Sequence, residues 1–220
     1  MKVTTDACLF GAWISFAVQN AVKIQRILDI GSGTGLLSLM LAQGCEARID
    51  AVEMDESAFE QSKENFSAAP WCERMTVYHS NIINFTSEKK YDLIISNPPF
   101  FKDDLKSPDA KKNIAKHDDT LTLQQLFKAV DQHLHEGGCF AVLLPYHRRE
   151  VFIKEAADHS LHIFKMMNVR QTPSHNPFRS LLLLSKKNTA GRILEMTIKN
   201  VEGNYSKDFI ELLKDYYLYL

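Results

Sequence analysis

One stretch of the sequence decides the fold, RILDIGSGTGLLSLMLAQ at residues 26–43. Residues 26–30 form a short apolar run typical of a buried strand, and residues 36–43 have the composition of a helix. Gly31, Gly33 and Gly35 lie between the two. Glycines at such a turn let the backbone bend tightly and let a ligand lie against bare amides at the helix N-terminus. The stretch therefore predicts a strand, a ligand-binding loop and a helix in succession.

A second strand, predicted over residues 49–54, carries an acidic side chain, Glu53, near its end. A carboxylate in that position accepts hydrogen bonds from ribose hydroxyls, as it does in dinucleotide sites. The spacing GxGxG differs from the GxGxxG of nicotinamide enzymes, so S-adenosylmethionine is the favoured nucleoside ligand. The alternative interpretation is a structural turn beside a surface glutamate.

Strands and helices alternate along the rest of the chain. Further strands are predicted over 75–80, 91–96 and 139–145, helices over 7–22, 55–66, 120–135, 147–160 and 205–220, and apolar segments over 162–170, 180–186 and 193–199. This alternation is typical of the α/β class with a mainly parallel sheet. No linker or repeat interrupts it, so we expect one domain over residues 1–220. Within it, residues 1–25 would close over the cofactor and substrate, and residues 190–220 would add a strand and a helix.

The composition excludes several classes of protein. The chain has 220 residues, and 26 basic against 27 acidic side chains give it a net charge of −1. Such a chain does not hold a polyanion through bulk charge, so any nucleic-acid contact needs a local basic face. Its four cysteines form no CxxC pair and no cluster with histidine, which predicts no disulfide and no metal site. The longest uncharged run, residues 7–22, is shorter than a membrane span, and we expect a cytoplasmic protein.

The most informative motif is DLIISNPPFF at residues 92–101, directly after a predicted buried strand. Pro98 and Pro99 end the sheet ladder and fix two φ angles. The Asn97 side-chain oxygen and the Pro98 carbonyl then form a rigid pair of acceptors for both hydrogens of an exocyclic amine, and Phe100 offers a ring for stacking. The alternative is a proline-rich loop with a core phenylalanine.

A second polar position, Asn81, follows the strand predicted over 75–80. From there Asn81 would accept a hydrogen bond from the adenine amine of the cofactor, and Ile82 would pack on the ring face. Taken alone, the pair is also compatible with a plain turn.

With these motifs in place, the chain resembles the class I S-adenosylmethionine-dependent methyltransferases of the NPPF/Y amino-methylating group. Within that group it is most similar to bacterial enzymes that methylate N6 of adenine 37 in a valine tRNA. The resemblance rests on KVTTDACLFGAW (2–13), LDIGSGTGLLSLMLAQ (28–43), DAVEMDESA (50–58), APWCERM (69–75), DLIISNPPFF (92–101), TLTLQQL (120–126) and NYSKDFIELLKDYYLYL (204–220). Members of the group usually carry a further segment ahead of the one that matches KVTTD.

The resemblance implies a Rossmann-like sheet of seven mainly parallel strands in the order 3-2-1-4-5-7-6, with the last strand antiparallel and helices on both faces. It implies a tRNA partner bound through its anticodon arm. The sequence does not fix the oligomeric state, and a monomer is favoured. Asn97, Pro98, Pro99 and Phe100 would be catalytic, and the cofactor would be bound by Thr5, Asp6, Gly31, Ser32, Gly33, Gly35, Glu53, Met54, Asn81, Ile82 and Asn97. Thr5 and Asp6 would touch its methionine end.

Basic residues are predicted to form a rim around the NPPF pocket for RNA. The candidate RNA contacts are Phe101, Lys102, His117, Arg148, Arg149, Arg170 and Arg179. The alternative interpretation of such residues is an ordinary solvated face.

Other functions share parts of this pattern. An rRNA guanine-N2 or protein glutamine-N5 methyltransferase would use the same chemistry, but the protein-directed enzymes usually have tyrosine where this chain has Phe100. The guanine-directed enzymes usually carry a second, duplicated domain. A non-catalytic cofactor- or RNA-binding module would not need the two amine acceptors of Asn97 and Pro98. Nicotinamide oxidoreduction is the most distant alternative.

Overall fold

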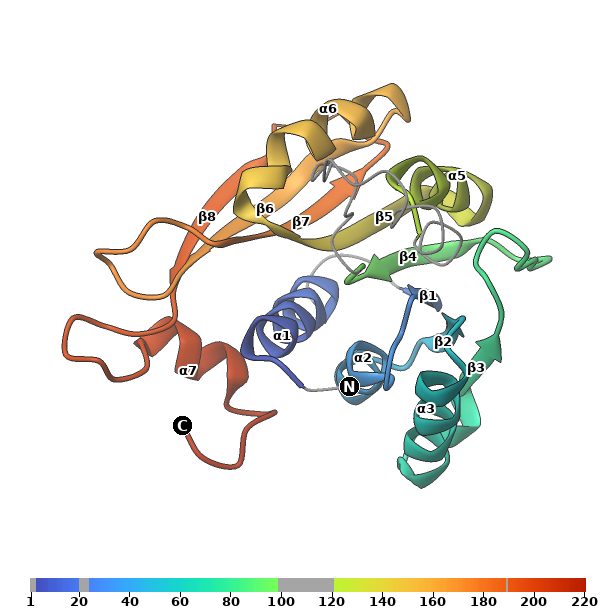
Figure 1. Ribbon diagram of the computed structural model, residues 1–220, viewed down its shortest axis with the longest axis horizontal. Helices are drawn as coiled ribbons and strands as arrows, with labels where there is room; N and C mark the ends of the chain where they lie inside the picture. The colour runs from blue at the N-terminus through green and yellow to red at the C-terminus, as the bar shows by residue number, and fades with distance from the viewer. Residues whose placement is uncertain (1–2, 20–23, 99–120, 189) are drawn as a thin grey trace, which may run out of the picture.

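A computed structural model describes residues 3–19, 24–98, 121–188 and 190–220. Within these residues eight strands form one sheet in the order β3-β2-β1-β4-β5-β7-β6-β8 (Figure 1). The strands are β1 (Arg26–Ile30), β2 (Arg48–Glu53), β3 (Met75–His79), β4 (Tyr91–Ser96), β5 (Leu134–Pro145), β6 (His162–Arg170), β7 (Arg179–Ser185) and β8 (Arg192–Thr197).

The strand directions confirm most of the predicted topology. β1, β2, β3, β4 and β5 run parallel to one another, and β7 runs antiparallel to both of its neighbours, β5 and β6. The order 3-2-1-4-5-7-6 with an antiparallel seventh strand is therefore confirmed. The predicted number of seven strands is wrong by one, because β8 pairs in parallel with β6 from Arg192 to Thr197. This pairing covers a strand edge that would otherwise expose its backbone groups.

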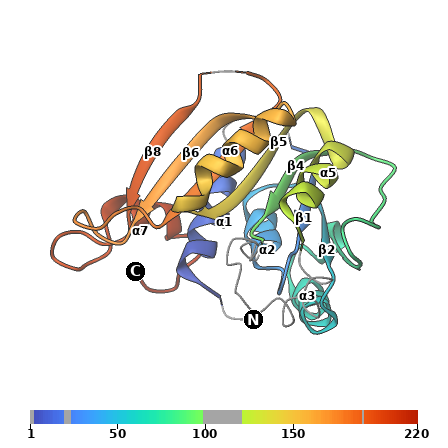
Figure 2. The same ribbon diagram turned by 45° about the horizontal axis from the view of Figure 1, so that its top comes forward.

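Helices cover both faces of the sheet, as predicted. On one face lie α1 (Thr5–Gln19), α2 (Leu36–Gly44) and α7 (Lys207–Leu213), with α3 (Glu56–Ala68) beside β2 and β3; on the other lie α5 (Leu123–His133) and α6 (Arg149–Asp158) (Figures 1 and 2). The central strands contribute side chains to the hydrophobic cores on both faces of the sheet. In β4, Leu93 and Ile95 belong to the core under α1, and Ile94 belongs to the core under α5. Strands buried on both faces read as continuous apolar runs, which is why β1 and β4 lack polar alternation.

Two helix and strand limits differ from the prediction for local reasons. The helix predicted over 120–135 ends at His133, and Gly137 and Gly138 lie inside β5, which begins at Leu134 rather than at residue 139. A Cβ on Gly138 would lie 2.8 Å from Leu134 Cδ1 and 3.0 Å from the Asp92 carbonyl oxygen, and the β4–β5 register shifts here. Gly138 therefore permits a close approach of two backbones within the sheet.

The C-terminal helix is shorter than the predicted span of 205–220. Ser206 caps α7 by accepting a hydrogen bond from the Phe209 amide at 3.2 Å, and the helix ends at Leu213. Beyond it the chain turns back toward α2: the Tyr216 hydroxyl donates to the Met40 carbonyl at 3.4 Å, and Gln43 donates to the Asp215 carbonyl at 2.8 Å. These tertiary contacts replace the last turns of a continuous helix.

In the parts of the chain that the structure describes, no helix is long and apolar enough to cross a membrane. The same parts contain no group of three or more histidine, cysteine, aspartate or glutamate side chains arranged to hold a metal ion.

The glycine after β1 that begins α2 is expected to be irreplaceable. Gly35 has a φ of 81°, and a Cβ there would lie 2.4 Å from the Phe66 ring of α3. We predict that Gly35→Ala lowers the free energy of unfolding by about 3 kcal/mol or more, from backbone strain and overpacking together. Gly203→Ala is the matched control, because its φ is 87° but nothing lies within 4 Å of the added Cβ. It should cost only about 1–2 kcal/mol. Equal losses in urea denaturation would contradict this account.

Candidate functional site

The predicted site residues follow successive parallel strands and therefore meet at one edge of the sheet. The glycine loop follows β1, Glu53 ends β2, Asn81 follows β3, and Asn97 follows β4. Strand order reverses between β1 and β4, and ligands of open α/β sheets bind outside the carboxyl ends of the strands at such a point. The structure thus brings together the residues that the sequence separates.

The glycine loop has the backbone conformation that its sequence predicts. Gly31, Gly33 and Gly35 have φ angles of 71°, 58° and 81°, which side chains with a Cβ rarely adopt. The Gly31 and Ser32 amides donate to the Val52 carbonyl at 2.9 and 3.3 Å. The loop is therefore tied to the end of β2 from its first residues.

Glu53 is buried and holds the loop from its side chain. Its Oε2 accepts a hydrogen bond from the Gly33 amide at 2.7 Å, and its Oε1 accepts from the Met54 and Asp55 amides at 2.8 and 2.9 Å. The sequence predicted a carboxylate free to meet a ribose, whereas this carboxylate also fastens the loop. A carboxylate oxygen accepts two hydrogen bonds, so Oε2 retains room for a ligand hydroxyl beside Gly33.

Two further features of the loop suit a polar nucleoside ligand. The Ser32 hydroxyl is buried and has no hydrogen-bond partner among the described residues. No described atom lies within 4 Å of the position that a Cβ on Gly31 would occupy. A buried polar group without a partner costs free energy unless a ligand satisfies it, so the loop fits the cofactor that the sequence predicts.

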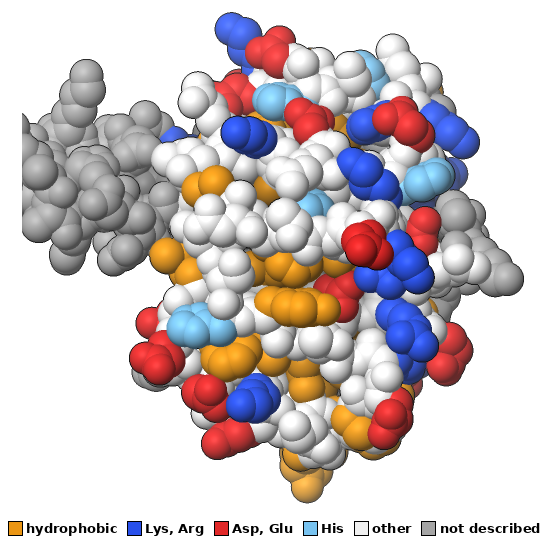
Figure 3. Space-filling view, turned by 90° about the vertical axis from the view of Figure 1, so that its right-hand side faces the viewer, with side chains coloured by type: hydrophobic (Ala, Val, Ile, Leu, Met, Phe, Trp, Pro, Cys, Tyr) orange, Lys and Arg blue, Asp and Glu red, His pale blue; other side chains and the backbone are white. Residues whose placement is uncertain are grey.

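The residues after β3 form a turn next to this loop. The Asn81 side-chain oxygen accepts a hydrogen bond from the Ile83 amide at 3.0 Å, and Ile82 is buried in the core under α5. Met54, Tyr78 and Ile83 are exposed along this side of the sheet. Figure 3 views the molecule from the side on which β3 and α3 lie in Figure 1; hydrophobic side chains lie across the middle of this face, and acidic and basic side chains are distributed around them.

Asn97 is held beside the glycine loop by the end of its strand. The Ser96 hydroxyl donates to the Ile30 carbonyl at 2.9 Å, which ties the last residue of β4 to the residue that precedes Gly31. Asn97 is half-buried directly after this tie, and Pro98 is buried. Five predicted site residues lie outside the described residues, namely Pro99, Phe100, Phe101, Lys102 and His117.

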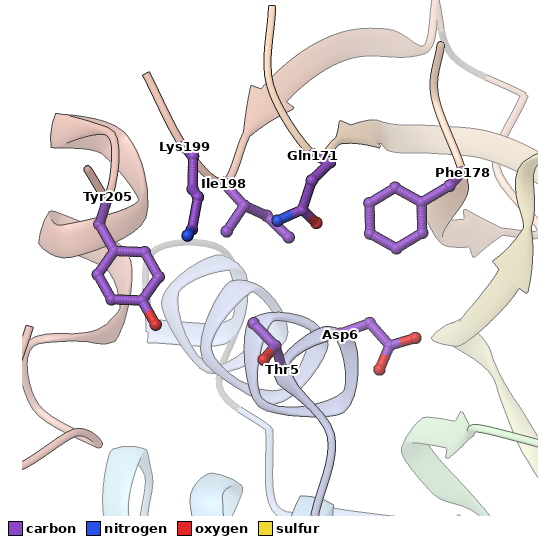
Figure 4. Close-up of a pocket in the computed structure, with 7 residues that line it drawn as sticks. All are labelled: Thr5, Asp6, Gln171, Phe178, Ile198, Lys199 and Tyr205. Atoms are coloured by element: carbon purple, nitrogen blue, oxygen red, sulfur yellow. The ribbon is translucent and has the colours of Figure 1, made fainter. Parts of the chain in front are cut away.

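Thr5 and Asp6 lie in the first turn of α1 and line a pocket on the side of β7 and β8 (Figure 4). Asp6 Oδ2 accepts a hydrogen bond from Arg179 Nε at 2.7 Å, which joins the start of α1 to the start of β7. Burial alone would raise the pKa of Asp6. Hydrogen bonds from Thr4 and Arg179, together with the charge of Arg179, outweigh this and lower the pKa below its ordinary value.

The candidate RNA-contacting arginines lie at the same edge of the sheet, but most of their charge is compensated within the chain. Arg170 pairs with Glu195 at 3.2 Å, Arg179 with Asp6, and Arg149 with Glu150 at 3.4 Å. The Arg149 guanidinium also lies 3.9 Å from the centre of the Tyr146 ring. Arg148 ends the 3-10 helix Tyr146–Arg148, which connects β5 to α6. The predicted basic rim is therefore weaker than the count of arginines indicates.

Sequence reasoning missed one titratable residue at this edge, Asp29. Its carboxylate is fully buried in β1; Oδ2 accepts from the Ser38 hydroxyl at 2.7 Å, and Oδ1 has no partner among the described residues. Burial, together with the nearby charge of Glu53, raises the pKa of Asp29 to about 7. The available signal was an acidic residue in an otherwise apolar strand.

Solved structures with a similar arrangement identify the fold of this protein. A predicted O-methyltransferase from Agrobacterium tumefaciens matches with a TM-score of 0.70 and 13% identity, over 94% of this chain and 95% of that one. A putative class I S-adenosylmethionine-dependent methyltransferase from Listeria monocytogenes matches with a TM-score of 0.63 and 14% identity, over 97% of this chain and 72% of that one. The fold is that of the class I methyltransferases.

Sequence comparison then gives the family. Residues 15–157 match the family described as the methyltransferase small domain. A curated relative from Phocaeicola vulgatus, named tRNA1(Val) (adenine(37)-N6)-methyltransferase, is 41% identical over 218 residues, which cover 99% of this chain and 91% of the relative. The chain belongs to the methyltransferase small domain family, and the resemblance inferred from its motifs is confirmed.

The raised pKa of Asp29 predicts a measurable dependence of stability on pH. Because its folded-state pKa of about 7 exceeds the unfolded value, the stability that Asp29 contributes is present below about pH 4 and is lost as the pH rises toward 7. Asparagine does not ionise, so the stability of Asp29→Asn relative to wild type should rise by up to about 4 kcal/mol between pH 4 and 7.

Urea denaturation of the cofactor-free protein across this pH range provides the measurement. Asp158→Asn, at the exposed end of α6, is the control and should give a curve parallel to wild type. An Asp29→Asn curve that also runs parallel to wild type would show that Asp29 is ionised throughout.

Proposed function

We propose that this protein methylates the exocyclic N6 amine of an adenine in tRNA, with S-adenosylmethionine as the methyl donor. The observation that carries the proposal is the position of Asn97, which follows β4 and is tied through Ser96 and Ile30 to the glycine loop. An amine held by Asn97 would therefore lie beside the ligand held by that loop. The cofactor supplies an activated methyl group; the residues of the chain supply position and polarity.

The cofactor half of the site would be formed by the glycine loop and its neighbours. The loop amides and the Ser32 hydroxyl offer donors, and Glu53 Oε2 offers an acceptor for a ribose hydroxyl. We propose Thr5, Asp6, Gly31, Ser32, Gly33, Gly35, Glu53, Met54, Asn81, Ile82 and Asn97 as the residues that hold the cofactor.

The amine half of the site would be formed by two acceptors at the end of β4. The Asn97 side-chain oxygen and the Pro98 carbonyl would each accept one hydrogen of the adenine amine. This pair draws the nitrogen lone pair out of conjugation with the ring and orients it, so no separate general base is needed. We propose Pro99 as the rigid support of this turn and Phe100 as the stacking surface for the base.

The names of the curated relatives support the choice of substrate. The relative from Phocaeicola vulgatus is named for adenine 37 of tRNA1(Val), and we propose the same adenine here, reached through the anticodon arm. A stacked base must leave its neighbours to enter such a site. Phe101, Lys102, His117, Arg148, Arg149, Arg170 and Arg179 are the proposed RNA contacts. We further propose that the chain acts as one domain, as a monomer and in the cytoplasm, where tRNA is modified.

The direct test is to incubate the protein with methyl-labelled S-adenosylmethionine and separate pools of tRNA, rRNA and protein. Nucleoside mass spectrometry of the labelled product should identify N6-methyladenosine in tRNA. Labelled N2-methylguanosine in rRNA, or labelled glutamine in protein, would replace the proposed substrate with one of the alternatives.

Asn97 should affect the chemical step rather than binding, because its hydrogen bond to the amine strengthens as the nitrogen becomes a nucleophile. We predict that Asn97→Ala lowers the single-turnover rate with saturating tRNA by about 10²–10³-fold, the scale for one lost preorganised polar partner. The affinity for tRNA should stay within about twofold of wild type, and saturating cofactor ensures that the rate reports the chemical step rather than weaker cofactor binding. Asn84→Ala, at an exposed asparagine after β3, is the control and should react normally. A wild-type rate for Asn97→Ala would show that the motif is only a structural turn.

A further inference from the structure

A pocket of about 370 Å³ lies at the same edge of the sheet as the proposed active site, between the start of α1 and the ends of β6 and β8. Figure 4 shows the Phe178 ring at one end and Tyr205 at the other, with Lys199 and Gln171 above and Thr5 and Asp6 below. Its volume falls in the range of pockets that hold small organic ligands, about 300–1,000 Å³. None of the comparisons assigns a role to it.

The walls of this pocket come from distant parts of the chain and are fixed by hydrogen bonds. The Lys199 amide donates to the Gln171 carbonyl at 2.9 Å, and Lys199 also forms an antiparallel bridge with Tyr205. The Phe178 amide donates to the Val169 carbonyl at 2.9 Å. The Tyr205 ring stacks on Phe209 with its centroid 4.8 Å away. The pocket is therefore preformed.

The charges in the pocket are separated between its two ends. Arg179 compensates the Asp6 carboxylate through its hydrogen bond at 2.7 Å. Lys199 is half-buried and has no ion-pair partner within the described residues. One end therefore offers an uncompensated cation, and the other offers an aromatic face with carboxylate, amide and hydroxyl groups around it.

This combination suits a nucleotide. A base can stack on the Phe178 ring and form hydrogen bonds through its edge with the Gln171 side chain, while a phosphate meets the Lys199 ammonium. The occupant is not the methylated adenine itself, because Asn97 is not among the described residues that line the pocket. Thr5 and Asp6 do line it, and they belong to the segment proposed to close over the cofactor.

We propose that this pocket binds a nucleotide adjacent to the target adenine, with its base on Phe178 and its phosphate on Lys199. The proposal rests on the proposed function, since it assumes an RNA substrate. The protein has a net charge of −1, and several of its arginines are paired within the chain. The proposed contacts explain how such a protein would still bind an RNA loop.

The phosphate contact is tested by Lys199→Gln, assayed by KM for the anticodon arm and by the salt dependence of RNA binding. Loss of one single-strand phosphate contact should raise KM about fivefold at 0.1 M salt and make the log–log salt slope about 0.7 less steep. Lys128→Gln, exposed on α5 across the sheet, removes the same charge and should change neither value. An unchanged KM and slope for Lys199→Gln would overturn the phosphate contact.

The base contact is tested by a double-mutant cycle between Phe178→Leu and RNA that lacks the base 5′ or 3′ of the target adenine. With wild-type protein, one of the two abasic RNAs should have a KM roughly 5- to 100-fold higher. With Phe178→Leu, removal of the same base should raise KM by less than about twofold, because the stacking surface is already lost. Thermal denaturation checks that Phe178→Leu is folded; if it is not, the KM and salt slope of Lys199→Gln decide the proposal.

Additive effects of protein and RNA changes would overturn the proposal. The proposal would also be overturned if the abasic RNAs raised KM fully while the Lys199 and Phe178 variants left KM unchanged. The failure of the proposed function is recognised separately, because wild-type protein would then not methylate the intact anticodon arm at all.

Discussion

The site depends on the hydrogen bonds between one buried carboxylate and three backbone amides. Glu53 ends β2 and accepts from Gly33 on one side and from Met54 and Asp55 on the other. Charge-assisted bonds of this kind are among the stronger ones in proteins. They hold a glycine loop whose positive φ angles leave it little intrinsic order. The shape of the loop thus depends on the residue that is also placed to meet the ribose of a nucleoside.

This arrangement concentrates polar groups at the edge of an apolar sheet, and some of them are buried without a hydrogen-bond partner among the described residues. Asp29 is fully buried one residue before the end of β1 with one oxygen unpartnered among the described residues, and its pKa is raised to about 7. The Ser32 hydroxyl is likewise buried without a described partner. Strained and unsatisfied groups of this kind gather at sites where a ligand completes the structure. The edge of the sheet is therefore preorganised for binding rather than for stability.

Much of the fold, and the set of residues that reach the carboxyl edge of the sheet, could be predicted from the sequence, because both depend on local patterns. A strand that ends in glycines and a strand that ends in Asn-Pro-Pro fix which residues reach the sheet edge, since parallel strands share that edge. The pairing of β8 with β6 was missed, because the partner of an edge strand is chosen by tertiary packing rather than by its own sequence. The early end of α7 has the same origin, in contacts of the segment after it with α2.

The electrostatics of the site were the least predictable part. The sequence shows that Arg149, Arg170 and Arg179 are basic, but not that Glu150, Glu195 and Asp6 lie next to them. It shows an acidic residue at position 53, but not the three amides around it. Pair distances of this kind arise from the folded arrangement of segments far apart in the chain, and no period or spacing encodes them.

The central claim is that Glu53 both fastens the glycine loop and binds the nucleoside ligand, and calorimetric titration of Glu53→Gln tests it most directly. The glutamine side chain keeps the volume but places an amide NH₂ against a backbone N–H, so at least one of the three hydrogen bonds is lost. S-adenosylmethionine and S-adenosylhomocysteine should both bind at least about tenfold more weakly, and by the same factor, because the ribose is common to both. Glu56→Gln, exposed in the first turn of α3, should leave both affinities unchanged. Wild-type affinity of a folded Glu53→Gln variant for both ligands would contradict the account.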